Sequence, residues 1–71
     1  MAQLTEFGKS VKKELIDLDR TQKWLIEKVS RNTGLYFDDS YLYKVLTGKL
    51  STPKIVQAIR EILDLPENDA S

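Results

Sequence analysis

Apolar residues recur at helical spacing in four short segments of this 71-residue chain, and no segment alternates apolar and polar residues as a strand does. At 100° per residue, the apolar residues of 53–63 cluster within about 120° of arc, and those of 39–47 within about 140°. Segments 5–17 and 22–33 follow the same spacing, although the apolar residues of 22–33 spread over about 200°. The sequence therefore predicts an all-α fold, a compact bundle of four short helices that pack together because none is stable alone.

Capping residues separate these segments. A side-chain oxygen directly before a helix can accept a hydrogen bond from a backbone N–H of its first turn. The predicted N-caps are Thr5, Thr21, Asp38 and Thr52. Pro53 strengthens the last of these signals, since proline tolerates the first helical position. Gly34 and Gly48 are the predicted C-caps of the second and third helices, because glycine readily adopts the left-handed conformation that ends a helix.

The same patterns predict the core. We expect one apolar face on 5–17, with Phe7, Val11, Leu15 and Leu18. On the second helix, Trp24 or Ile26 should lie at the edge of the buried face. The link Leu35-Tyr36-Phe37 should pack onto the core, because three apolar residues in a turn are poorly placed in solvent.

Composition excludes most catalytic and metal chemistry. The chain has no cysteine and no histidine, so it has no disulfide, no thiol chemistry and none of the usual zinc ligands. Its glycines stand too far apart to form a phosphate-binding loop, and its close acid pairs do not continue into a calcium loop. We expect no enzyme activity, no cofactor, no metal and no small-molecule ligand. No stretch is apolar enough for a membrane span or secretory leader, so we expect a cytoplasmic protein that binds no membrane.

Charge is balanced overall but unevenly placed. The chain carries 11 basic and 11 acidic residues. Residues 64–71 hold three acids and no base, which leaves 11 bases against 8 acids in residues 1–63. We therefore expect a mildly basic domain over residues 1–65, followed by an acidic, mobile tail over residues 66–71.

Two motifs carry a family resemblance. The first is Thr21-Gln22-x-x-Leu25, followed after a turn by Asp38-Asp39-Ser40-Tyr41-Leu42-Tyr43-Lys44-Val45-Leu46-Thr47-Gly48-Lys49. The second is Phe7-Gly8-Lys9-x-Val11-Lys12-Lys13-x-Leu15. Together, over residues 4–65, they resemble the Cro/CI-type (lambda-repressor-like, XRE-type) helix-turn-helix DNA-binding family. The chain departs from that family in having Ile26 where a small residue is usual, and in a lengthened turn before Asp38.

The resemblance implies a sequence-specific transcriptional regulator, a small phage or mobile-element repressor, whose third helix enters the major groove of double-stranded DNA. It implies base reading by Asp39, Ser40 and Lys44, and Tyr43 and Thr47 share their face. The expected phosphate contacts are Gln22, Lys49, Ser51, Thr52 and Lys54. A bound repressor would be associated with the bacterial nucleoid. A homodimer would use Leu63, Leu65 and the exposed part of the 35–37 link, or would form only on DNA.

A second hypothesis comes from a different functional class. The zero net charge, the acid pair Asp38-Asp39 and the tyrosines 36, 41 and 43 also suit a helix-turn-helix scaffold that binds protein, as an antirepressor or a recombination cofactor. Salt separates the two hypotheses, because DNA binding through phosphates weakens steeply with salt while aromatic burial does not.

Overall fold

Four helices form most of the structure, a computed structural model that describes residues 3–65. They are α1 (Glu6–Asp17), α2 (Gln22–Thr33), α3 (Asp39–Leu46) and α4 (Pro53–Leu63). The described residues contain no strand, which confirms the predicted all-α bundle. Two ends differ by one residue from the prediction. The first helix begins after Thr5, which is its extended N-cap, and the third ends before Thr47, which is its C-cap.

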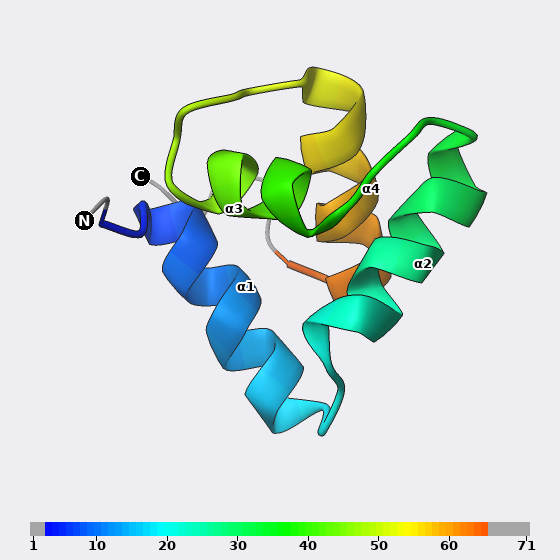
Figure 1. Ribbon diagram of the computed structural model, residues 1–71. Coiled ribbons are helices and arrows are strands. Elements are labelled where there is room, and N and C mark those ends of the chain that lie inside the picture. Colours follow the sequence, from blue (N-terminus) through cyan, green and yellow to red (C-terminus); the bar gives the residue numbers. More distant parts are fainter. Residues whose placement is uncertain (1–2, 66–71) are drawn as a thin grey trace.

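The helices surround a single core. α1 and α2 diverge from the short link that joins them, and α3 lies across their separated ends (Figure 1). α2 packs most extensively against α4, and α1 contacts both α3 and α4. Every helix contributes buried apolar side chains, and the link before α3 adds one more. The buried apolar residues are Val11, Leu15, Leu25, Val29, Phe37, Leu42, Val45, Leu46, Ile55, Ala58, Ile59 and Leu63.

Three of the four predicted N-caps are confirmed. Thr5, Thr21 and Asp38 each accept a hydrogen bond from the backbone N–H three residues on, at 3.0, 3.0 and 2.8 Å. Thr52 stands at the N-cap position of α4, but the prediction that its side chain caps the helix is wrong. Its hydroxyl lies 2.7 Å from the Tyr41 hydroxyl instead, so it joins α3 to the start of α4.

Left-handed residues end two helices near the predicted positions. Gly34 is the C-cap of α2, with φ of 71°, as predicted. Gly48 has φ of 82°, but it follows the C-cap Thr47 rather than being the cap itself. The turn at Gly48 directs the N–H groups of Lys49 and Leu50 back to a carbonyl of α3. The loop after α3 is therefore held against the end of that helix.

Burial differs from the prediction at the ends of helices. Leu18 is 44% exposed; it is the C-cap of α1, and the chain turns away from the helix at the next residue, Asp19, whose φ is 57°. In the link before α3, Phe37 alone is buried, while Leu35 and Tyr36 are 40% and 78% exposed. The prediction that the whole link packs onto the core is therefore wrong. A single ring anchors it, with its centroid 5.0 Å from that of Tyr41.

The edge of α2 is as predicted, since Trp24 and Ile26 are both half-buried against the core. No helix within residues 3–65 is long and apolar enough to cross a membrane. The predicted acidic tail, 66–71, lies outside the described residues.

α1 and α3 approach each other backbone to backbone. The Thr5 N–H and hydroxyl both donate to the Leu46 carbonyl oxygen, at 3.0 and 3.1 Å. Gly8 lies against the same carbonyl, and a Cβ placed there would overlap its oxygen and lie 3.0 Å from its carbon. The N-terminal end of α1 is thus fixed to the C-terminal end of α3, which orients α3 in the bundle.

Candidate nucleic-acid interface

α3 has one buried face and one exposed polar face. Leu42, Val45 and Leu46 point into the core and are at most 3% exposed. The other face is open to solvent along the length of the helix. Its exposed residues are Asp39, Ser40, Tyr43 and Lys44. The structure therefore brings four of the five predicted base-reading residues together on one solvent-facing surface.

Thr47, the fifth of these residues, is half-buried. Its hydroxyl donates to the Tyr43 carbonyl at 2.9 Å, with a longer approach of 3.4 Å to the Lys44 carbonyl. Because the hydroxyl proton is used within α3, only the oxygen lone pairs and the methyl group remain for an outside contact. A role for Thr47 in base reading stays a prediction, and it would have to use the oxygen lone pairs or the methyl group of the side chain.

The two adjacent acids before α3 have separate positions. One carboxylate oxygen of Asp38 accepts from the Tyr41 N–H at 2.8 Å, and the other accepts from the Tyr36 hydroxyl at 2.7 Å. Both oxygens therefore help to fix the start of α3. Asp39 is exposed at the first helical position, where negative charge is favoured by the helix dipole. Of the pair, Asp39 is the acid open to an outside partner.

Hydrogen bonding shifts the titration of Tyr36 and Asp38. The Tyr36 hydroxyl is the largest influence that lowers the pKa of Asp38, and the Tyr41 N–H lowers it further. The reciprocal hydrogen bond to Asp38 raises the pKa of Tyr36. The cap of α3 is therefore a charged carboxylate paired with a neutral phenol at neutral pH.

The loop after α3 places a lysine beside the polar face. The N–H groups of Lys49 and Leu50 donate to the Lys44 carbonyl, at 2.8 and 3.2 Å. The Lys49 ammonium lies 6.0 Å from the centre of the Tyr43 ring, within the outer range of a cation–π contact. The loop therefore extends the α3 surface with a positive charge.

The remaining predicted phosphate contacts fall in two places. Ser51 and Lys54 are exposed beside Lys49, at the entry to α4, and Thr52 is half-buried there. Gln22 is exposed at the first position of α2, at the end of that helix away from its link to α3 (Figure 1). It lines a hollow of about 250 Å³ with Lys12, Leu15, Ile16 and Arg20. None of the described contacts joins Gln22 to the α3 surface.

Two hydrogen bonds near α3 and one hollow elsewhere on the domain were not predicted from the sequence. The hydrogen bonds of Tyr36 with Asp38 and of Tyr41 with Thr52 follow from how the links fold back, and residue spacing alone does not signal them. A basic hollow between α2 and α4 was also missed, although Trp24, Lys28 and Arg31 recur at helical spacing, which was an available signal.

Within residues 3–65, no group of three acid, histidine or cysteine side chains could hold a metal ion. Comparisons with protein-family models, with curated proteins and with solved structures find no match to this chain. Its function must therefore be inferred from its own residues.

Proposed function

We propose that this protein binds double-stranded DNA in a sequence-specific manner and regulates transcription, as a small phage or mobile-element repressor does. The observation that carries the proposal is the exposed polar face of α3, which is presented by a helix whose opposite face is fully buried. A major groove about 12 Å wide admits a helix of this kind, and short polar side chains near its N-terminus suit the edges of base pairs. The resemblance to the Cro/CI-type family supports the same function.

Each base-reading residue has a chemical role in this proposal. Lys44 donates to the O6 and N7 acceptors of guanine, and Ser40 donates to or accepts from several base edges. Asp39 accepts from the N4 amino group of cytosine, a major-groove donor that a carboxylate can pair with. Tyr43 and Thr47 flank these contacts.

The phosphate contacts hold α3 in register. Lys49, Ser51, Thr52 and Lys54 lie along the loop between α3 and α4, and their contacts with the backbone would be independent of sequence. Gln22 would add a contact at the N-terminus of α2, where unpaired backbone N–H groups favour an anion. A dimer through the predicted residues has less apolar surface to use than the sequence indicated. Leu63 is 1% exposed and Leu65 is half-buried, so among these residues the exposed apolar surface is at Leu35 and Tyr36.

A two-dimensional amide NMR titration with a mixed-sequence duplex, at about 50 and then 200 mM salt, tests this function, because nonspecific binding needs no knowledge of the operator. We expect shifts at Gln22, Ser40, Tyr43, Lys44 and Lys49 that fade as salt rises. The backbone amide of Glu61, an exposed acidic residue of α4 outside the predicted contacts, provides an internal control that should not move. An unchanged spectrum at low salt would contradict DNA binding.

One observation favours the alternative, a helix-turn-helix scaffold that binds protein. Leu35 and Tyr36 are exposed next to α3, and Tyr43 is 48% exposed on it, so apolar and aromatic surface is available for an interface. Binding through these residues should change little between 50 and 200 mM salt. A silent DNA titration would make this function the better proposal.

A further inference from the structure

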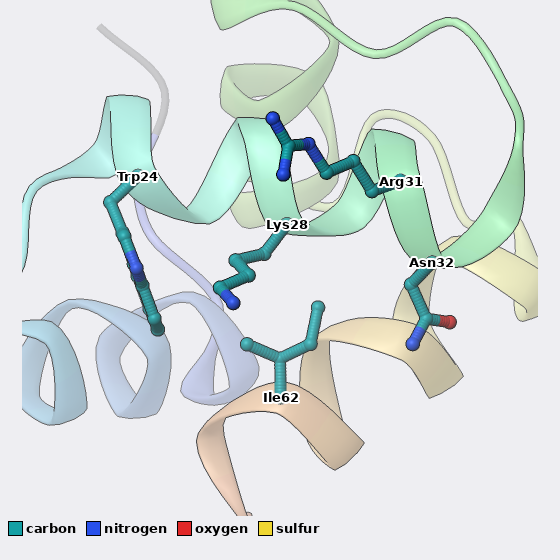
Figure 2. Close-up of a pocket in the computed structure, with 5 residues that line it drawn as sticks. All are labelled: Trp24, Lys28, Arg31, Asn32 and Ile62. Carbon is teal, nitrogen blue, oxygen red and sulfur yellow. The ribbon is translucent and has the colours of Figure 1, made fainter.

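A second surface with distinct chemistry lies between α2 and α4. A hollow of about 450 Å³ is lined by Trp24, Lys28, Arg31, Asn32 and Ile62. Figure 2 shows Trp24, Lys28 and Asn32 extending from α2 towards Ile62 on α4, with Arg31 lying along α2. The polar and cationic side chains that line the hollow therefore come from α2, and its apolar side chains come from both α2 and α4.

The apolar part of the hollow is centred on the indole of Trp24. Trp24 and Ile62 are both half-buried and pack against the core, so each also keeps apolar surface open to solvent. Two cations approach the indole. The Arg20 guanidinium lies 5.3 Å from the ring centre and the Lys28 ammonium lies 5.9 Å from it. An aromatic side chain fixed in this way resembles the rigid anchors that concentrate binding energy at interfaces.

The charged part of the hollow has no internal counter-charge. No carboxylate lines it, and the ion pair found within residues 3–65 joins Lys9 to Glu6 on α1. Glu27 lines a smaller adjoining hollow of about 70 Å³, beside Lys28 and Arg31. Lys28 and Arg31 are both exposed, and no carboxylate of residues 3–65 lines the hollow with them, so the hollow favours a negatively charged partner.

This surface lies on a different side of α2 from the candidate DNA contact. At 100° per residue, Trp24, Lys28, Arg31 and Asn32 span about 100° of the helix circumference. Gln22 lies about 160° around the helix from Trp24. A partner in the hollow and a DNA phosphate at Gln22 would therefore meet separate sides of α2.

We propose that the hollow between α2 and α4 docks an acidic peptide segment of a protein partner. An apolar side chain of the segment packs on Trp24 and Ile62, and flanking carboxylates pair with Lys28 and Arg31. A DNA backbone could use the cations but has no side chain for the apolar floor, whereas a peptide uses both. This docking proposal does not rest on the function proposed for α3.

Trp24 makes the test specific to the site, because it is the single tryptophan of the chain. The probe is a ten-residue peptide of aspartate and glutamate with one leucine at its centre and no aromatic residue. We expect a saturable change in Trp24 fluorescence at millimolar peptide. Replacing the central leucine by alanine should weaken binding, since the apolar contact is lost.

Charge reversal tests the cationic wall. Lys28→Glu should weaken peptide binding about fivefold or more, because attraction is replaced by repulsion. Arg31→Glu, a second exposed substitution, should act in the same direction. Lys23→Glu is the matched control, since Lys23 is exposed on the same helix and does not line the hollow. Far-UV circular dichroism verifies that each variant is folded.

Four outcomes would overturn the proposal. The first is that the leucine peptide leaves Trp24 emission unchanged, and the second is that the leucine and alanine peptides bind equally well. The third is that Lys28→Glu and Lys23→Glu weaken peptide binding equally. The fourth is that duplex DNA changes Trp24 emission and that Lys28→Glu weakens this DNA binding. The last outcome would assign the hollow to nucleic acid. Failure of DNA binding at α3 in the NMR titration leaves these peptide measurements unaffected, so the two proposals fail separately.

Discussion

Gly8 packs directly against the carbonyl of Leu46, so α1 and α3 touch without a side chain between them. In an exposed helix, Gly→Ala would add up to about 1 kcal/mol of stability. Here we expect Gly8→Ala to lower the free energy of unfolding by about 1–3 kcal/mol, because the new methyl group overlaps backbone atoms that cannot rotate away. Urea denaturation measures the change. Lys13→Ala, on the exposed side of α1, should stay within about 0.5 kcal/mol, and a stabilised Gly8→Ala would show that the helices can separate at no cost.

The ring of Phe37 anchors the link between α2 and α3. Phe37→Leu should lower the free energy of unfolding by about 1–2 kcal/mol, since it removes buried contacts, including those with Tyr41. Leu35→Ala, two residues away and partly exposed, should change stability by about 0.5 kcal/mol or less. The same urea experiment compares them. Equal losses would mean that the link packs as a unit rather than through one residue.

The Asp38 carboxylate fixes the start of α3. Asp38→Ala should lower Tm by about 4–8 °C, because the Tyr41 N–H and the Tyr36 hydroxyl both lose their acceptor. Asp38→Asn should recover most of that loss, since its amide oxygen can still cap the helix. Thermal circular dichroism gives Tm. If the Asn variant were as unstable as the Ala variant, charge rather than capping geometry would hold the helix end.

The hydrogen bond between Tyr36 and Asp38 predicts a dependence on pH at both extremes. The pKa of Asp38 is lowered from 3.8, so its contribution is present above that pH and is lost as pH falls through the lowered value. The pKa of Tyr36 is raised from 10.0, so its contribution is present below that pH and is lost as pH rises through the raised value. Tyr36→Phe should remove the contribution of Tyr36 and the part of the Asp38 contribution that comes from the phenol, while the hydrogen bond from the Tyr41 N–H remains.

Two measurements follow for Tyr36→Phe. The Tm difference between the wild-type protein and this variant should be largest in the neutral range, and should shrink in strong acid and in strong base. In the variant, the carboxyl carbon of Asp38 should titrate at a higher pH by NMR, nearer its ordinary value. An unshifted Asp38 titration would show that the phenol does not bond to the carboxylate in solution.

Lys44 and Lys49 should differ in their effects on DNA. Lys44→Ala should cost about 1–3 kcal/mol on a cognate site and relax base preference at one position, because it removes a base contact. Lys49→Ala should weaken binding to all sequences alike and reduce the salt slope, because it removes a phosphate contact. Fluorescence anisotropy on cognate and scrambled duplexes separates them. Equal losses on both duplexes for Lys44→Ala would remove it from the base-reading set.

Local signals account for the parts of this fold that sequence could predict. Caps and glycines act within a few residues of themselves, so Thr5, Thr21, Asp38 and Gly34 were correctly placed. The helical period likewise located the buried face of α3, and with it the exposed polar face that forms the candidate site.

Long-range contacts account for the misses. The Thr52 hydroxyl failed as a cap because Tyr41, on another helix, offers a partner that residue spacing does not reveal. The hollow at Trp24 required Ile62 from the far end of the chain. Leu35 and Tyr36 were assigned to the core because of their apolar character. The five-residue link between α2 and α3 buries only one of its side chains, that of Phe37, against the core. These contacts depend on how the helices pack against one another, which the sequence of a single segment does not determine.

The Tyr41–Thr52 hydroxyl contact also bears on the thermodynamics of binding. With the two N–H bonds to the Lys44 carbonyl, it holds the 47–52 loop to α3 at both ends. A ligand that spans α3 and this loop meets one preorganised body, so little conformational entropy is lost when the loop is engaged. The heat-capacity change on binding should then match the area buried between the partners, with no additional contribution from folding of the loop.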